Sequence, residues 1–198
     1  CAESRAVMPF WLVSLRASLT FLTRIPVGGF PYPKKTWEWI SVWFPLVGLF
    51  LGALQAGIWL GLDDHSELTR ALVAVTFGVI VTGGFHEDGL SDSADALGGG
   101  YDRASVLRIL KDSRIGAFGA LALILALMLK VSLLVDLGAM APVGFLLGQS
   151  LSRAVPVIQL GVQSYARRDD SDSKSRDVAR SGRPQAVIVA LWVVVLMF

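Results

Sequence analysis

The chain contains a run of 22 residues, 41–62, without a single charged side chain. A helix of that length is about 33 Å long, which is enough to cross the ~30 Å hydrocarbon core of a bilayer. Composition points the same way, because 54% of the 198 residues are hydrophobic and only 17% are charged. Soluble domains carry about 25% charged residues. We therefore expect an all-α, polytopic integral membrane protein that folds as a helical bundle.

Four further apolar segments set the expected number of membrane crossings. They occupy residues 71–85, 115–135, 137–166 and 186–198. We expect about four to five membrane segments in all, preceded by a short interfacial helix over residues 10–22. Pro156 is expected to kink or end the helix around it. Because the last segment has only 13 residues, we expect residues 1–198 to be a single membrane domain that is truncated at its C-terminus.

Smaller features refine this arrangement. Gly48 and Gly52 lie four residues apart, which permits close packing of two helices. The stretch 30–39 mixes Trp, Pro and Lys, as is typical of the headgroup level, and the serine-rich, basic stretch 167–184 predicts a loop. Lys and Arg concentrate before the first span, between spans in the region 103–114, and again in 167–184. The positive-inside rule therefore places these three regions on the cytoplasmic side.

The most unusual stretch for such an apolar chain is its acidic centre, residues 83–119. Six of the sixteen acidic residues of the chain fall here, between two apolar segments, and five of them are candidate ligands: Glu87, Asp88, Asp92, Asp95 and Asp112. If the stretch from Asp88 continues as a helix, Asp88, Asp92 and Asp95 project within an arc of ~60°. Clustered carboxylates repel one another unless a cation neutralises them, and oxygen ligands favour Mg²⁺, Mn²⁺ or Ca²⁺ over Zn²⁺. The pattern thus favours a divalent cation site.

A second interpretation of the same stretch is a solvated acidic loop, in which Asp88 and Asp92 cap helices beside Gly89. It accounts for any single aspartate better than for the whole set. The spacing does not match the calcium loop of an EF-hand. The chain also lacks both glycine-rich phosphate-binding motifs, G-x4-G-K-S/T and G-x-G-x-x-G. Any nucleotide phosphate would therefore be held through a metal ion and cationic side chains.

Four basic residues are candidates for binding an anionic substrate. Lys111 and Arg114 flank Asp112, and Arg is suited to bidentate contacts with phosphate oxygens. Arg153 and Arg167 lie in or near apolar segments, where charge is usually functional. The alternative roles are topology signals for Lys111 and Arg114 and a headgroup contact for Arg167. A net charge of +2 gives no support for nucleic acid binding, and a single cysteine excludes an internal disulfide.

The acidic centre closely resembles the cobalamin synthase family, adenosylcobinamide-GDP ribazoletransferase. The resemblance rests on TGGFHEDGLSDSADALGG at residues 82–99 and on LRILKDSRIGAFGA at residues 107–120. Shorter similarities occur at residues 23–27, 44–48 and 165–167. Members of that family normally continue through further membrane helices. The similarity touches most of the chain, and its central block is specific.

The resemblance implies a reaction and a place for it. Such enzymes join α-ribazole, or its 5′-phosphate, to adenosylcobinamide-GDP and release GMP in the last steps of vitamin B12 biosynthesis. A multi-pass protein of the bacterial or archaeal cytoplasmic (inner) membrane is implied, with its acidic active-site loop facing the cytoplasm. The implied partners are the two small-molecule substrates and the lipid bilayer, with a homo-oligomer as a further expectation.

The resemblance also implies roles for the acidic residues. Asp88, Asp92, Asp95 and Asp112 would hold Mg²⁺ with help from Glu87, and either Asp92 or Asp95 would take the proton of the attacking hydroxyl. Two rival functions stay open. One is a CDP-alcohol phosphotransferase acting on a lipid, because the spacing of Gly84, Asp88 and Asp92 reproduces half of that signature. The other is a divalent-cation transporter that uses intramembrane acids.

Overall fold

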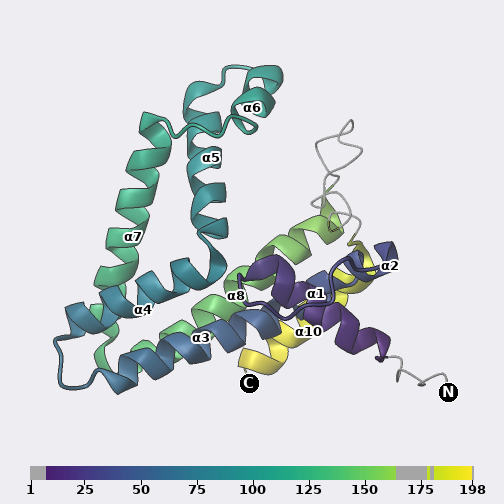
Figure 1. The fold of residues 1–198 in the computed structure, drawn as a ribbon. Coiled ribbons are helices and arrows are strands. Elements are labelled where there is room, and N and C mark those ends of the chain that lie inside the picture. The colour runs from purple at the N-terminus through teal and green to yellow at the C-terminus, as the bar shows by residue number, and fades with distance from the viewer. Residues whose placement is uncertain (1–7, 164–177, 179–180, 198) are drawn as a thin grey trace. The chain divides into compact units, whose positions relative to one another are not determined.

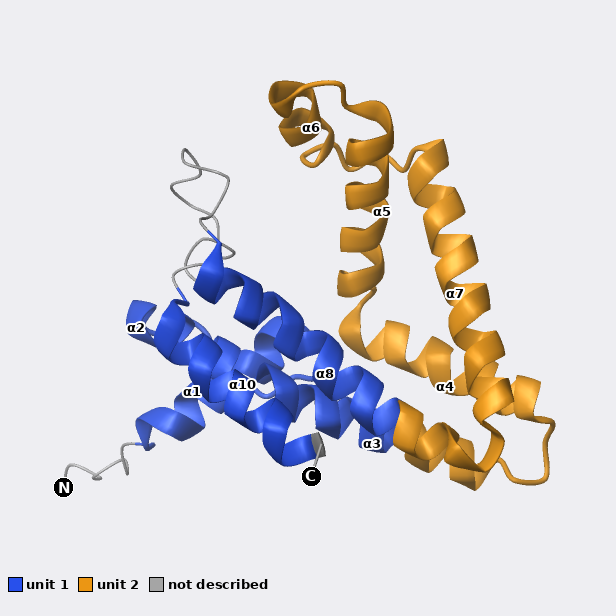
Figure 2. Ribbon diagram, turned by 180° about the vertical axis from the view of Figure 1, so that it is seen from behind, with its two compact units in different colours: residues 1–54, 145–198 blue, residues 55–144 orange. Residues whose placement is uncertain are grey.

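The computed structural model describes residues 8–163, 178 and 181–197, and within them every regular element is helical, as expected (Figure 1). The chain divides into two compact units (Figure 2). Unit 1 comprises residues 1–54 and 145–198, and unit 2 comprises residues 55–144. Helices α3 (Phe44–Gly61) and α8 (Ala141–Val162) each contribute residues to both units. The expectation of a single membrane domain stays a prediction.

Unit 1 begins with the short helix that the sequence predicts, α1 (Phe10–Leu22). It is followed by α2 (Lys34–Trp37) and the 3-10 turn η1 (Ile40–Trp43). Phe21 of α1 stacks on Phe44 with their ring centroids 5.7 Å apart, and it also makes an edge-to-face pair with Trp37, with centroids 6.3 Å apart. Tyr32 and Trp37 are buried. Part of the aromatic set in residues 30–39 therefore belongs to the protein core.

Helices α3 and α8 approach each other closely within unit 1. A Cβ atom on Gly48 would lie 2.2 Å from the backbone oxygen of Gln149, and one on Gly52 would lie 2.5 Å from that of Phe145. The hydroxyl of Ser150 donates a hydrogen bond to the Pro45 carbonyl at 2.9 Å. The prediction that the glycine pair permits close helix packing is confirmed.

The structure bears on two expectations about proline in unit 1. Pro156 lies inside α8, which continues to Val162, so this proline does not end the helix, and the expected kink stays a prediction. Helix α10 (Arg183–Met197) begins three residues before the predicted start of the last apolar segment, so Pro184 is helical rather than part of a loop. Proline is tolerated in the first turn because the N–H that it lacks would have no intrahelical partner there.

Unit 2 contains α4 (Glu67–Thr82), α5 (Phe85–Gly99), α6 (Arg103–Ile109), α7 (Ala117–Leu137) and the 3-10 turn η2 (Gly138–Met140). The axes of α4 and α5 differ by 87°. The bend falls at Gly83 and Gly84, whose φ angles of 68° and 71° lie in the left-handed region. Other L-residues adopt that region at a cost of roughly 1–2 kcal/mol, so two glycines allow the chain to turn abruptly here.

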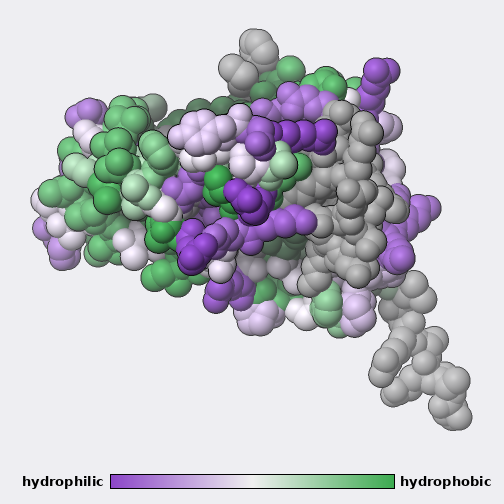
Figure 3. All heavy atoms as spheres, turned by 90° about the horizontal axis from the view of Figure 1, so that it is seen from above, coloured by the Kyte–Doolittle hydropathy of each residue, from purple (hydrophilic) through white to green (hydrophobic). Residues whose placement is uncertain are grey.

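Length and composition identify two described helical stretches that are able to cross a membrane, Ile40–Gly61 and Ala117–Val162. The second has 46 residues and includes α7, η2 and α8. The bent pair α4 and α5 would make a third if it is one broken span. Apolar residues also gather on the outer surface, shown in green in Figure 3. These features fit a membrane protein, and the expected four to five segments stay a prediction.

Candidate active site

Four of the five predicted acidic ligands lie in helix α5 and not in a loop, whereas Asp112 lies in the segment between α6 and α7. Glu87 and Asp88 occupy its first turn, where carboxylates are stabilised by the positive end of the helix dipole. The predicted helical continuation is therefore confirmed, and Asp88, Asp92 and Asp95 share one helical face. Glycine again ends the element, since Gly100 leaves the helical region with φ −97° and ψ 125°.

Asp95 of α5 lies against the first turn of α7. Its Oδ2 accepts a hydrogen bond from the backbone N–H of Gly116 at 2.7 Å, and its Oδ1 accepts one from Gly119 at 2.8 Å. Gly116 is the N-cap of α7 and has no side chain with which to cap the helix. A carboxylate from a different helix thus satisfies two N–H groups that have no partner within α7.

The two glycines leave the space that the Asp95 carboxylate occupies. A Cβ atom on Gly116 would lie 2.4 Å from Oδ1 of Asp95, and one on Gly119 would lie 2.3 Å from Oδ2. The Cβ atom on Gly119 would also lie 2.4 Å from Oγ of Ser91. Sequence reasoning assigned no role to these residues. The available signal was a Gly-x2-Gly spacing at the start of an apolar helix that lacks a capping side chain.

Asp112 and Arg114 form an ion pair in the segment between α6 and α7. Nη2 of Arg114 lies 2.7 Å from Oδ2 of Asp112, and Nε lies 3.0 Å from Oδ1. The Arg114 side chain is 86% exposed. Its hydrogen bonds lower the pKa of Asp112 from 3.8 to about 2, and Asp112 in turn raises the pKa of Arg114. Asp112 is therefore ionised at neutral pH, beside a cation that is exposed to solvent.

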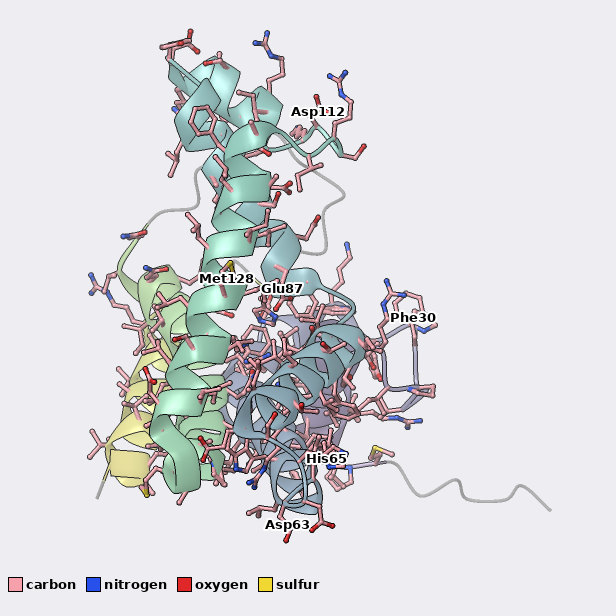
Figure 4. The ribbon with its side chains drawn as sticks, turned by 90° about the vertical axis from the view of Figure 1, so that its left-hand side faces the viewer. Phe30, Asp63, His65, Glu87, Asp112 and Met128 are labelled. Carbon is pink, nitrogen blue, oxygen red and sulfur yellow. The ribbon has the colours of Figure 1, made fainter. Side chains whose placement is uncertain are left out.

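The three remaining acidic residues occupy the first half of α5. Asp88 is exposed, and Glu87 and Asp92 are half-buried. Oε2 of Glu87 is shielded from solvent and has no hydrogen-bond partner among the described residues. Figure 4 shows Glu87 near the start of α5 and Asp112 towards the other end of that helix. The structure therefore does not bring the five predicted ligands together.

No group of three His, Cys, Asp or Glu side chains in the described ranges is close enough to hold a metal ion. Mg²⁺ is commonly bound through one or two carboxylates, with water and substrate phosphates completing the shell. The oxygen chemistry of α5 fits such an ion, and no described residue donates a hydrogen bond to the buried Oε2 of Glu87. The predicted ligand set stays a prediction.

The predicted cationic residues are distributed over both units. Lys111 is exposed and follows α6 in unit 2, close in sequence to Arg114. Arg153 lies in the unit 1 part of α8 and is only 4% exposed. Its Nη1 donates to the backbone oxygen of Gln149 at 3.0 Å and also contacts the side-chain oxygen of that residue. Arg167 lies outside the described residues.

Comparison with known proteins covers almost the whole chain. The sequence model of the cobalamin-5-phosphate synthase family matches residues 14–198. Relatives named adenosylcobinamide-GDP ribazoletransferase, from Shewanella woodyi and Shewanella putrefaciens, are 38% identical over 195 and 198 residues. Each alignment covers 91% of this chain and 72% of the relative. No solved structure matches the chain.

Proposed function

Because this chain belongs to the cobalamin-5-phosphate synthase family, we propose that it is an adenosylcobinamide-GDP ribazoletransferase. The observation that carries the proposal is the family match over residues 14–198, which includes all of α5 and the segment up to α7. A ribose hydroxyl of α-ribazole, or of its 5′-phosphate, attacks the corrinoid-side phosphorus of adenosylcobinamide-GDP. A new O–P bond forms, the P–O–P bond breaks, and GMP leaves.

The carboxylates in the first half of α5 are assigned to the reacting groups. Asp92 accepts the proton that the attacking hydroxyl loses, since it is half-buried and lies one helical turn from Asp88. Glu87, Asp88 and Asp92 would hold Mg²⁺, and that ion would neutralise charge developing on the diphosphate. The buried Oε2 of Glu87 supports this assignment, since it accepts no hydrogen bond from the part of the chain that the structure describes. Asp95 and Asp112 carry other hydrogen bonds and are left out of it.

Cationic residues are assigned to the anionic substrates. Arg114 presents an exposed guanidinium next to Asp112, and an exposed ion pair of this kind contributes little to stability. A diphosphate can therefore replace Asp112 as the partner of Arg114 at small cost. Lys111 adds a second positive charge from the same segment. Arg153 and Arg167 stay candidates for a second contact with substrate.

The location belongs to the same proposal. The apolar helices Ile40–Gly61 and Ala117–Val162 support a multi-pass protein of the bacterial or archaeal inner membrane. The excess of Lys and Arg at residues 103–114 supports a cytoplasmic position for that segment, where Mg²⁺ and nucleotides are available.

The test measures GMP release by the protein in detergent micelles or proteoliposomes. Adenosylcobinamide-GDP with α-ribazole is expected to give GMP and a corrinoid product of the expected mass, only when Mg²⁺ is present. A CDP-activated lipid with an alcohol acceptor serves as the control donor, and Mn²⁺ uptake into proteoliposomes tests for transport. Turnover of the CDP-lipid alone, or cation flux without GMP release, would contradict the proposal.

A further inference from the structure

We propose that Asp95 is a positioning residue, which caps α7 from the adjacent helix and thereby fixes the end of the basic segment 110–116. The sequence predicted a metal ligand or a general base at this position instead. The evidence for the cap is the two hydrogen bonds that Asp95 accepts from α7. Only the consequence for substrate binding rests on the proposed function, because that function assigns Lys111 and Arg114 to the diphosphate.

The hydrogen bonds of Asp95 reproduce a capping box. In an ordinary box the N-cap side chain accepts the backbone N–H of residue N3, and the N3 side chain accepts that of the N-cap. Helix α6 builds such a box locally from Asp102 and Ser105. In α7 the N-cap is Gly116 and N3 is Gly119, so neither has a side chain for this purpose. One carboxylate supplies both acceptors, at 2.7 Å and 2.8 Å.

Both oxygens of Asp95 are directed at N–H groups of α7, and this argues against a metal ion at the same atoms. An N–H hydrogen and a divalent cation are both positive, so they compete for the same oxygen lone pairs. The negative charge of Asp95 is already stabilised by the N-terminal end of the 21-residue helix α7. The carboxylate therefore has a structural partner without any ion.

The cap has a direct consequence for the basic segment. Helix α6 ends at Ile109 and α7 begins at Ala117, so seven residues connect them. Asp95 holds the last of these, Gly116, which is only two positions from Arg114. Releasing Gly116 frees the end of the segment from α5, and the guanidinium of Arg114 loses its fixed position. The expected result is weaker binding of the diphosphate rather than loss of the proton acceptor.

The first test measures amide hydrogen exchange at Gly116 and Gly119 in the detergent-solubilised protein. Asp95→Asn is expected to speed exchange at both by about tenfold, because its NH₂ group leaves one amide without an acceptor and its uncharged oxygen is a weaker acceptor for the other. Gly119→Ala is expected to do the same, although alanine is the better helix former, because the new Cβ meets the carboxylate. Gly57→Ala is the control, since its Cβ would point into open space.

The second test separates positioning from metal binding by kinetics. Asp95→Asn and Gly119→Ala are both expected to raise the KM for adenosylcobinamide-GDP, by about tenfold, and to leave the Mg²⁺ concentration for half-maximal activity unchanged. The double variant is expected to be no worse than Asp95→Asn, since both changes remove one contact. A higher Mg²⁺ requirement in Asp95→Asn but not in Gly119→Ala would instead identify a metal ligand and overturn the proposal.

The two tests fail independently. If the unmodified protein releases no GMP, the proposed function is wrong, and the exchange rates alone decide whether the cap exists. If Asp95→Asn leaves exchange at Gly116 and Gly119 unchanged, the cap is overturned even when the enzyme is fully active. A large fall in kcat for Asp95→Asn, with normal exchange and normal KM, would identify Asp95 as the base.

Discussion

The guanidinium of Arg70 lies over the indole ring of Trp59, 4.5 Å from the ring centroid. Nε of Arg70 also donates a hydrogen bond to the backbone oxygen of Trp59 at 2.8 Å. Trp59 is 1% exposed and lies near the end of α3, whereas Arg70 belongs to the first turn of α4. One side chain thus joins two consecutive helices of unit 2 through a cation–π contact and a hydrogen bond.

Arg70→Ala is expected to lower the free energy of unfolding by about 1–2 kcal/mol, because it removes both contacts with Trp59. Denaturant titration in mixed micelles measures this loss. GMP release per folded molecule is expected to be unchanged, since Arg70 has no part in the proposed site. Arg108→Ala, an exposed arginine of α6, is the control for stability. A stable but inactive Arg70→Ala protein would contradict this division of roles.

Asp88→Asn and Asp92→Asn are each expected to reduce Mg²⁺-dependent GMP release by at least about 100-fold. The amide that replaces each carboxylate carries no charge, so it holds a divalent cation poorly and cannot accept the hydroxyl proton. Membrane insertion and folding are expected to be normal, because Asp88 is exposed and Asp92 is only half-buried. Asp63→Asn, in the turn before α4, provides an exposed control. Near-normal turnover in either variant would remove that residue from the site.

Arg114→Gln is expected to raise the pKa of Asp112 from about 2 back towards 3.8, because Arg114 is the source of the shift. The folded pKa is the lower one, so the ion pair is fully formed above pH ~4 and is lost as pH falls through about 2. An NMR titration of the Asp112 carboxyl carbon measures the change, and Lys111→Gln is the control. A pKa that stays near 2 in Arg114→Gln would show that another group causes the shift.

At neutral pH, Arg114→Gln also distinguishes the loss of the Arg114 cation from a change in the protonation of Asp112. Asp112 is ionised at pH 7 with or without Arg114, since both pKa values lie far below 7. A loss of GMP release in Arg114→Gln at that pH therefore reports the missing cation and not a protonated Asp112. The expected kinetic effect is a higher KM for adenosylcobinamide-GDP.

Local patterns in the sequence predicted the helices well. The run 10–22 became α1 at the predicted boundaries, and the uncharged run 41–62 became η1 and α3 within one residue. Such runs reveal helices because the backbone N–H and C=O groups of a long segment in an apolar environment must bond to each other, and a helix satisfies all of them within the segment. The shared helical face of Asp88, Asp92 and Asp95 was also predictable, because it depends only on the helical period.

The role of Asp95 was not predictable from such patterns. Its two hydrogen bonds join residues that are 21 and 24 positions apart. They form only because Gly116 and Gly119 have no side chain in the space that the carboxylate occupies. Helical spacing placed Asp95 with Asp88 and Asp92, although the contacts of its carboxylate are with α7. The start of α10 was missed because Pro184 was interpreted as part of a loop, while proline is compatible with a first helical turn.

Gly48→Ala is expected to destabilise unit 1 by about 2 kcal/mol, even though alanine favours helix formation by about 1 kcal/mol over glycine. The new Cβ would lie 2.2 Å from the Gln149 backbone oxygen and 2.9 Å from Cδ of Arg153. Backbone atoms of α8 cannot turn aside, so α3 and α8 must separate, and the buried Arg153 must move with them. Denaturant titration measures the loss in stability.

Gly148→Ala is the matched control for this prediction, because it lies in α8 and its Cβ would meet no atom within 4 Å. It is expected to be neutral or slightly stabilising. If Arg153 also contacts substrate, Gly48→Ala raises the KM for adenosylcobinamide-GDP in molecules that remain folded, and Gly148→Ala does not. Equal stability of the two variants would show that α3 and α8 are not in close contact at Gly48.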